Sequence, residues 1–213
     1  MKSSRRNFFK TAGLGLAGSA VLVGCSPKKT EKSVSNMTVA YIREATVEQK
    51  YVDYAKKAKE DNFPKVSLMF TALAKAESIH AANHQRVLEK LKGKYLGFPV
   101  GRYAVLSTLE NLQDGMATEK YEVEVMYPAF MEEAKNEDSL DALESFKWAY
   151  QVEIQHMGYY SVALTSLGTG TELTMPEKWY ICPQCGGSYA LADVKSTCYF
   201  DPTPKDKFIE FKL

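Results

Sequence analysis

Two tetrads of the form Glu-x-x-His limit the possible folds of this chain more than any other feature. Glu77 and His80 form the first, Glu153 and His156 form the second, and the two glutamates lie 76 residues apart. Residues three apart on a helix share one face, so each tetrad points a carboxylate and an imidazole in the same direction. Two such helices facing each other could hold a pair of metal ions.

The two halves of the chain repeat each other at the same offset. Tyr51 matches Tyr127 and Phe70 matches Phe146, in register with the two tetrads. Chance similarity between amphipathic helices could produce some of these matches, but it would hardly align both tetrads. A duplicated helical hairpin explains the repeat, and its pseudo-two-fold symmetry would place the tetrads opposite each other.

The spacing of apolar residues predicts four long helices with no strand-like alternation between them. The expected helices cover residues 38–60, 62–93, 102–135 and 139–168. Asn62 is a candidate cap for the second helix, and Asp138 or Ser139 for the fourth. Pro128 is expected to kink the third helix. The pattern predicts a mainly α fold, an antiparallel four-helix bundle over residues 39–170.

Glutamates on the other two expected helices could complete a two-metal site. Carboxylate bundles that hold two metals take one Glu from each of two helices and a Glu-x-x-His from each of the other two. The candidates are Glu44 and Glu48 on the first helix and Glu119, Glu122 and Glu124 on the third. Carboxylates with one imidazole per metal favour iron or manganese over zinc. Without a cation, burying so many carboxylates together would be very unfavourable.

The segments that carry these residues resemble the rubrerythrin family. In the first half the resemblance rests on Glu44-Ala45-Thr46, on the run from Tyr51 to Ala58, and on the first tetrad. In the second half it rests on Glu119-Lys120-Tyr121-Glu122, on Met126-Tyr127-Pro128, and on the second tetrad. The similarity covers residues 39–200 and implies a ferritin-like di-iron bundle.

The resemblance also implies roles for single residues. The expected iron ligands are Glu44, Glu77, His80, Glu119, Glu122, Glu153 and His156, with Glu77 and Glu153 bridging the two ions. Glu122 is the additional carboxylate that exchanges with a histidine as the irons change oxidation state. Tyr127 is expected beside the metals as a hydrogen-bond donor or radical buffer, so Glu122 and Tyr127 are the catalytic candidates. Two further glutamates, Glu48 and Glu124, are expected to face solvent, and His84 to be a neighbour of the site or a surface residue.

Residues 171–213 look like a degenerate rubredoxin module. Cys182-Pro183-Gln184-Cys185-Gly186 resembles its first metal-binding turn, and Cys198 follows at the expected distance. Asp201 stands where a fourth cysteine is expected. Three alternatives remain open. The four side chains could hold iron at a shifted potential, they could hold zinc, or the site could be empty with Cys182 and Cys185 oxidised.

The N-terminus predicts export. Arg5 and Arg6 precede an apolar run that ends at Gly24, and this run is too short for a comfortable transmembrane helix. Residues 1–24 resemble a twin-arginine signal. Leu22-Val23-Gly24-Cys25 resembles a lipoprotein box, which would put a lipid on Cys25; the alternative is an apolar anchor with an incidental cysteine. Residues 25–38 are polar and predict a tether, so we expect a lipid anchor in a membrane, on its extracytoplasmic side.

Charge and resemblance together suggest a function. Outside residues 1–24 the chain has 23 basic and 26 acidic residues, so nucleic acid is not an expected partner. The resemblance implies a homodimeric peroxidase that reduces hydrogen peroxide to water. Its electrons would come from an unidentified donor through the rubredoxin-like site, often that of a partner subunit. The alternatives are a ferroxidase of ferritin-like fold and a non-enzymatic lipoprotein with a structural zinc site.

Overall fold

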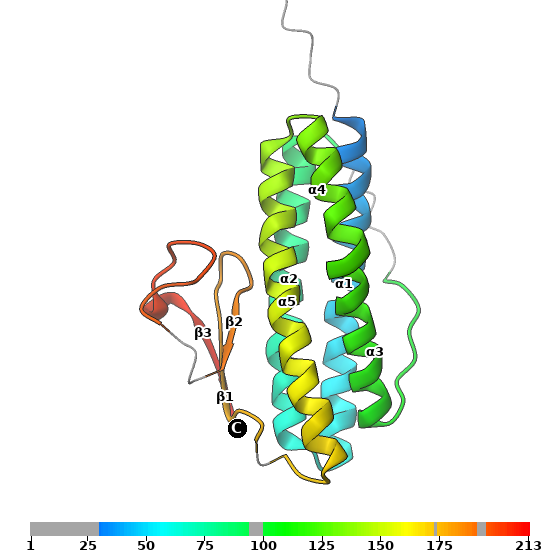
Figure 1. The fold of residues 1–213 in the computed structure, drawn as a ribbon, viewed down its shortest axis with the longest axis vertical. Coiled ribbons are helices and arrows are strands. Elements are labelled where there is room, and N and C mark those ends of the chain that lie inside the picture. The colour runs from blue at the N-terminus through cyan, green and yellow to red at the C-terminus, as the bar shows by residue number, and fades with distance from the viewer. Residues whose placement is uncertain (1–29, 94–99, 173, 191–194) are drawn as a thin grey trace, which may run out of the picture.

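The computed structural model describes residues 30–93, 100–172, 174–190 and 195–213. In these residues four helical columns form an antiparallel bundle, with a small sheet beside it (Figure 1). The columns are α1 (Glu31–Glu60), α2 (Pro64–Lys90), the combined α3 (Thr108–Tyr121), η1 (Glu122–Met126) and α4 (Tyr127–Asn136), and α5 (Leu140–Gly168). The predicted fold class is confirmed. No helix in this part of the chain is both long and apolar enough to cross a bilayer.

The first helix begins earlier than expected. α1 starts at Glu31 rather than at residue 38, so the polar segment predicted as a tether over residues 25–38 is helical from its seventh residue onward. Glu137 causes this difference, because its carboxylate accepts hydrogen bonds from the backbone N–H groups of Lys32 and Ser33 at 3.0 and 2.8 Å. N–H groups in the first turn of a helix have no partner inside that helix. The carboxylate of Glu137, which is distant in the sequence, therefore stabilises this terminus.

α2 is capped in a similar way. Asn62 was expected to be its cap, but Asn62 lies in the left-handed region at φ 63°, and Phe63 occupies the cap position without a side-chain bond. The Glu172 carboxylate accepts instead from the N–H groups of Lys65 and Val66, at 3.2 and 2.7 Å. Pro64 opens the helix, as expected.

The third column starts later than predicted. α3 begins at Thr108 instead of residue 102, because Ser107 and Glu110 form a capping box. Asp61, at the end of α1, accepts a further hydrogen bond from the Thr108 N–H at 3.1 Å. The fourth column begins after Ser139, one of its two candidate caps, and ends at Gly168, as the sequence predicted.

A π-helical segment interrupts the third column just before Pro128, the residue at which a kink was expected. Within η1 the N–H of Tyr127 bonds to the carbonyl of Glu122, five residues earlier. The internal repeat explains why an extra residue must fit here. Tyr51 follows Glu44 by seven residues, but Tyr127 follows Glu119 by eight. The π turn absorbs the additional residue and keeps the two halves in register.

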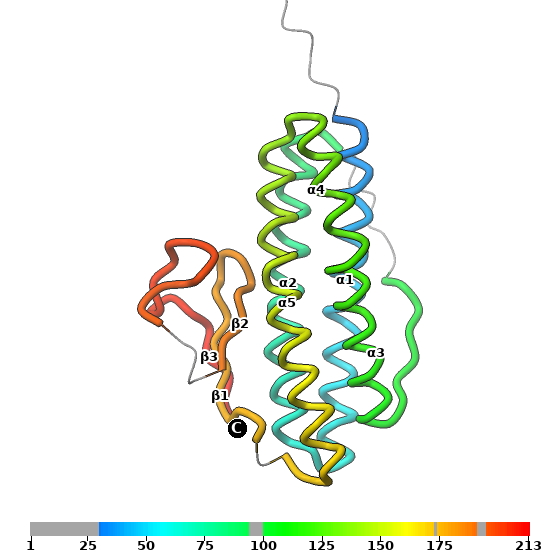
Figure 2. Tube along the Cα trace, in the orientation of Figure 1, coloured from blue at the N-terminus to red at the C-terminus, as the bar shows by residue number. Residues whose placement is uncertain are grey.

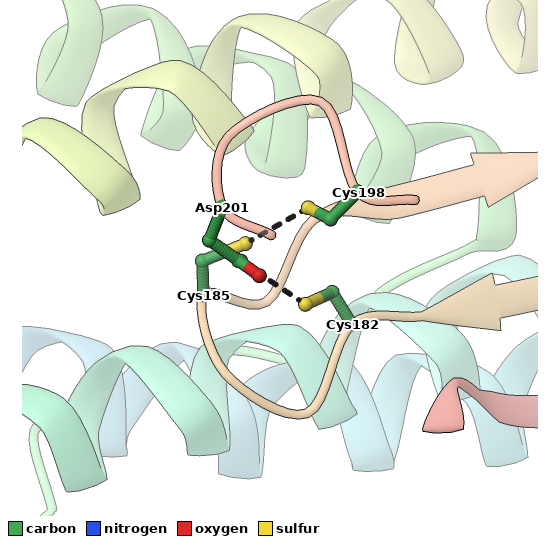
Figure 3. A group of neighbouring side chains, drawn as sticks. All are labelled: Cys182, Cys185, Cys198 and Asp201. Atoms are coloured by element: carbon green, nitrogen blue, oxygen red, sulfur yellow. Dashed lines mark hydrogen bonds between the residues drawn. The ribbon is translucent and has the colours of Figure 1, made fainter. Parts of the chain in front are cut away.

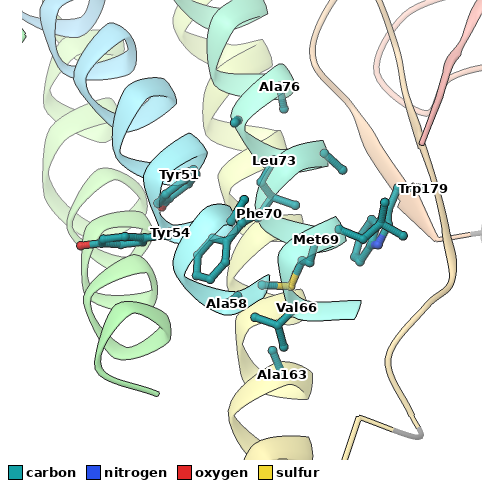
Figure 4. Close-up of a cluster of buried hydrophobic side chains, with 14 of the residues drawn as sticks. Tyr51, Tyr54, Ala58, Val66, Met69, Phe70, Leu73, Ala76, Ala163 and Trp179 are labelled. Atoms are coloured by element: carbon teal, nitrogen blue, oxygen red, sulfur yellow. The ribbon is translucent and has the colours of Figure 1, made fainter. Parts of the chain in front are cut away.

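Two apolar clusters fill the bundle. One includes Tyr51, Phe70 and Tyr160, and Figure 4 shows Tyr51 and Phe70 together with other members of that cluster. The other includes Leu88 and Phe146. Along α1 and α5, the glutamates and histidines of the expected metal site fall between the stretches that belong to the two clusters, and on α2 Glu77 and His80 lie at the end of the first stretch. Apolar packing therefore encloses a polar centre from both ends.

The C-terminal module consists of three antiparallel strands. β1 (Lys178–Ile181) is central, with β2 (Ser188–Ala190) and β3 (Ile209–Lys212) on either side; η3 (Lys205–Lys207) is a short 3₁₀ turn. The module lies beside α2 and α5 (Figure 2). Trp179 of β1 is fully buried against the bundle, and its ring meets Tyr159 of α5 edge-on at 4.6 Å. The module is thus packed onto the bundle at the level of its polar centre.

Candidate metal centre

Two overlapping groups of side chains meet inside the bundle. The first contains Glu44, Glu77, His80 and Glu153, and the second contains Glu77, Glu119, Glu153 and His156. All are buried, and the candidate ligand atoms of each group lie within 4.8 Å of one another. Glu77 and Glu153 belong to both groups, which is the placement that a bridging pair requires. The structure therefore brings together six of the seven residues expected at the di-iron site.

Each histidine turns the same ring nitrogen toward this centre. His80 Nδ1 lies 2.9 Å from an oxygen of Glu77 and 2.9 Å from one of Glu153. His156 Nδ1 lies 2.8 Å from an oxygen of Glu153 and 3.1 Å from one of Glu77. The Nε2 atoms point away, and His156 Nε2 is 3.0 Å from Ser188 Oγ in the C-terminal module. That contact fixes the ring, as outer hydrogen bonds to metal-bound histidines commonly do.

The chemistry of these groups fits two cations. Within the described residues, Glu44, Glu119 and Glu122 each keep one buried carboxylate oxygen without a hydrogen-bond partner. Buried polar atoms are rarely left unpaired, because the loss of hydration is unfavourable. Oxygen-rich sites with one imidazole per metal suit iron. Metal ions would supply the missing partners of Glu44 and Glu119, which belong to the two groups.

The pKa shifts of the buried groups indicate that the metal-free centre lacks positive charge. Burial raises the pKa of Glu44 and Glu119 well above the ordinary value, and neighbouring carboxylates raise it further. Burial opposes protonation of His156, yet Glu77 and Glu153 raise its pKa to about 9. The metal-free protein would therefore hold protons on this histidine where a cation would otherwise sit.

Two tyrosines hold carboxylates of the centre in equivalent ways. Tyr51 donates to Glu119 at 2.5 Å, and Tyr127 donates to Glu44. Both tyrosines are fully buried. Tyr127 therefore lies beside the centre as a hydrogen-bond donor, as the resemblance implied. Its counterpart in the pseudo-two-fold repeat is Tyr51.

Glu122 is buried beside the two groups but belongs to neither. Its carboxylate pairs with the Arg43 guanidinium, which also lies 4.7 Å above the Tyr121 ring. Burial and the charge of Glu153 raise the pKa of Glu122 to about 8, although Arg43 acts in the opposite direction. Arg43 is partly exposed and lines a surface cavity of about 500 Å³. The sequence analysis missed Arg43, although it directly precedes Glu44 on α1.

The remaining polar candidates, Glu124, Glu48 and His84, differ in burial and in distance from the centre. Glu124 is exposed and pairs with Lys120, as expected of a solvent-facing residue. Glu48 is half-buried and lies outside both groups. His84 is fully buried next to the centre, so it is a neighbour of the site and not a surface residue.

The C-terminal module touches the centre through its first metal-binding turn. A Cβ atom at Gly186 would lie 2.5 Å from His80 Nε2, which leaves no room for a side chain there. Asn83 of α2 donates to the Gln184 carbonyl at 2.8 Å, and Gln155 of α5 accepts from the Ser188 N–H at 3.0 Å. The turn that contains Cys185 is therefore held by hydrogen bonds against α2 and α5, the two helices of the same chain that carry His80 and His156.

Cys182, Cys185, Cys198 and Asp201 converge in a second candidate site (Figure 3). The sulfurs of Cys185 and Cys198 lie 3.4 Å apart, and Cys182 Sγ is 3.2 Å from Asp201 Oδ2. Tetrahedral zinc, with bonds of about 2.0–2.3 Å, separates its ligands by about 3.5 Å, so only small shifts would admit such an ion. Thr203 N–H holds the other oxygen of Asp201 at 2.7 Å. All three cysteines of this site are free thiols in the structure.

Comparison with known proteins identifies the family. The rubrerythrin family model matches residues 35–164. The chain belongs to the rubrerythrin family. It is 28% identical over 172 residues to rubrerythrin-2 of Clostridium acetobutylicum, covering 81% of this chain and 92% of that protein. It is 27% identical over 190 residues to nigerythrin of Nitratidesulfovibrio vulgaris, covering 89% and 92%.

The structural comparison agrees. Fully reduced, all-ferrous nigerythrin matches with a TM-score of 0.76 at 26% identity, over 97% of this chain and all of that one. Rubrerythrins are di-iron oxidoreductases, so the two overlapping groups in the bundle correspond to the family's di-iron centre. The Cys₃Asp site is a place where a further metal could bind.

Proposed function

We propose that this rubrerythrin is a peroxidase that reduces hydrogen peroxide to water, as part of a defence against oxidative stress. The observation that supports this most is Glu122, a buried carboxylate next to the two groups but paired with Arg43. A ferroxidase, the alternative function, has less need of an additional carboxylate beside a complete set of ligands. Glu122 is available to move toward a metal when the charge of the centre changes.

The proposed roles of the residues follow from their positions. Glu77 and Glu153 would bridge two iron ions, with Glu44 and His80 on one and Glu119 and His156 on the other. When bound, two ferrous ions supply the two electrons that cleave the O–O bond. Tyr127 and Tyr51 orient the outer carboxylates through their hydrogen bonds. The apolar clusters on either side exclude bulk water.

The C-terminal module provides a short route for electrons. Its Cys185 turn contacts His80 in the same chain, so the proposed route does not depend on a partner subunit. Because Asp201 replaces a fourth cysteine, the identity of the metal bound at this site decides whether the site can carry electrons. The electron donor and the expected homodimer remain predictions.

The decisive experiment compares two oxidants. The purified protein is loaded with two equivalents of ferrous iron without oxygen and mixed in a stopped-flow instrument with hydrogen peroxide or with dioxygen. We expect oxidation by peroxide to be clearly faster, with two ferrous ions oxidised per peroxide. Equal or faster oxidation by dioxygen would exclude the peroxidase and favour the ferroxidase.

We also propose that the protein acts outside the cytoplasm on a lipid anchor at Cys25. The expected twin-arginine signal and lipoprotein box fall within residues 1–29, outside the described part of the chain. Labelling of cells with a radioactive fatty acid tests the anchor. Label should enter the protein and be lost in Cys25→Ala; label retained in that variant would refute it.

A further inference from the structure

A line of hydrogen bonds runs from the protein surface to the metal centre through His84. His84 Nδ1 lies 2.8 Å from Ser145 Oγ, and His84 Nε2 lies 3.0 Å from the Tyr127 hydroxyl. Tyr127 in turn donates to Glu44. One polar chain therefore connects α5, α2, α4 and α1 inside a part of the bundle that is otherwise apolar.

The direction of each bond can be deduced from the donors available. Tyr127 gives its only hydrogen to Glu44, so its oxygen must accept from His84 Nε2–H. Neutral imidazole then has a bare Nδ1, which accepts from the Ser145 hydroxyl. Every bond in the line points toward Glu44.

Ser145 marks the outer end of the line. It lines a cavity of about 160 Å³ between α2 and α5, together with the charged residues Arg86, Lys90 and Glu144. A cavity needs about 10–15 Å³ of such volume to hold one water molecule, so this cavity has room for several. Ser145 thus lies between this cavity and the buried imidazole of His84.

The pseudo-two-fold repeat shows that packing does not require this line. At the repeat's offset of 76, His84 corresponds to Tyr160 and Ser145 corresponds to Met69. Tyr51, the counterpart of Tyr127, meets the Tyr160 ring edge-on at 5.9 Å, and Met69 is fully buried in the apolar cluster. The equivalent positions in the other half therefore hold a tyrosine and a buried methionine, so the Ser145 hydroxyl has no counterpart there.

We propose that Ser145, His84 and Tyr127 form a proton path from the surface cavity to Glu44. This inference rests on the proposed function, since reduction of one peroxide to two water molecules consumes two electrons and two protons. A proton from cavity water replaces the Ser145 hydrogen, which moves to His84 Nδ1. The Nε2 hydrogen moves to Tyr127, and the Tyr127 hydrogen moves to Glu44. One proton is delivered to Glu44 and one is taken from cavity water, and the ring proton must return from Nδ1 to Nε2 before the path can carry the second proton.

The path can be tested first on the metal-free protein. Nitrogen-15 NMR should show His84 as the Nε2–H tautomer, with its N–H exchanging with solvent severalfold more slowly in Ser145→Ala. Ser33→Ala is the matched control, since Ser33 is also a buried serine and makes neither of the two His84 hydrogen bonds. The Nδ1–H tautomer, or the same exchange rate in Ser145→Ala as in the wild type, would overturn the proposal.

The iron-loaded protein provides the second test. His84→Gln keeps a hydrogen-bonding group beside Tyr127 but cannot pass a proton between two ring nitrogens. Single-turnover oxidation by peroxide should slow severalfold in His84→Gln and Ser145→Ala, with unchanged iron content and a larger solvent deuterium isotope effect, and remain normal in Ser33→Ala. Wild-type rates in both relay variants would refute the path. If the wild type itself fails to react with peroxide, the proposed function fails, while the exchange measurement still judges the path.

Discussion

Gly186 in the C-terminal module lies so close to His80 of α2 that no side chain could stand at position 186. The same glycine has a φ of +81°, which other residues adopt only with strain. The contact places the turn from Cys185 to Gly187 against Nε2 of His80. The other ring nitrogen of His80, Nδ1, faces the di-iron centre. The methyl group of an alanine at position 186 would therefore clash with His80 unless the module moved.

Replacing Gly186 by Ala should therefore loosen the module. A positive φ costs alanine about 1–2 kcal/mol, and the clash with His80 should add about 1–3 kcal/mol, as overpacking typically does. Thermal unfolding should shift downward, and proteolysis of the connection between α5 and β1 should become faster. Gly170→Ala is the control, because Gly170 has a similar φ of +73° but no heavy atom within 4 Å of an added Cβ. Equal losses in the two variants would contradict a role for the contact.

The two groups in the bundle predict unequal effects of single ligand changes. Glu153 belongs to both groups, whereas Glu44 belongs to one. Anaerobic titration with ferrous iron should show two bound ions in the wild type, one in Glu44→Ala and none in Glu153→Ala. Two ions bound to Glu153→Ala would show that the bridge lies elsewhere.

The terminal site should bind a metal through Asp201. With cobalt(II) as a probe, the wild type should show the visible bands of a tetrahedral thiolate site, and Asp201→Ala should bind the ion at least about tenfold more weakly, a loss typical of metal sites. Asp201→Cys should give stronger charge-transfer bands, because four thiolates replace three. Asp206→Ala, an exposed change in the same module, should have no effect. With iron, a rubredoxin-like spectrum seen only in Asp201→Cys would show that the natural site does not hold iron in a redox-active form.

The metal-free protein should become less stable as pH rises. The pKa of Glu122 is raised to about 8 from an ordinary 4.5, and that of His156 to about 9 from 6.5. The folded state therefore binds more protons than the unfolded state, and the free energy of unfolding falls between pH 6.5 and 9. The pKa of Glu153 is lowered, but its contribution is already complete above pH 4.5 and does not change in this window.

Thermal unfolding of metal-free protein across this pH range measures the effect. Manganese(II), added without oxygen, should stabilise the protein more at pH 9 than at pH 6.5, because metal binding displaces the bound protons. Stability that is constant or rises with pH in the metal-free protein would show that the buried carboxylates and histidines ionise as they do in the unfolded chain.

The bundle and the two tetrads could be predicted because their signals are local, whereas Glu44 and Glu119 were singled out by the resemblance to the family. Apolar spacing marks each helix, and the interval from Glu77 to His80 recurs from Glu153 to His156. The later start of α3 was also visible, since Ser107 and Glu110 form a recognisable capping pair. The spacing difference that creates the π segment was likewise present in the sequence.

Other features depend on contacts between distant residues. The early start of α1 depends on Glu137, which lies more than 100 residues further along the chain. The ion pair of Arg43 with Glu122 and the hydrogen bond between Ser145 and His84 each join separate helices. Periodicity identifies the face of a helix on which a residue lies but not the partner that it meets, so these contacts could only be found in three dimensions.

The single additional residue absorbed by the π segment makes the two iron positions unequal. A perfect duplication would give both ions one histidine, one tyrosine-held glutamate and two shared carboxylates. Only the half with the π turn adds Glu122 and, through it, the charge of Arg43. We therefore expect the two irons to differ in reduction potential, so that one of them gives up its electron first.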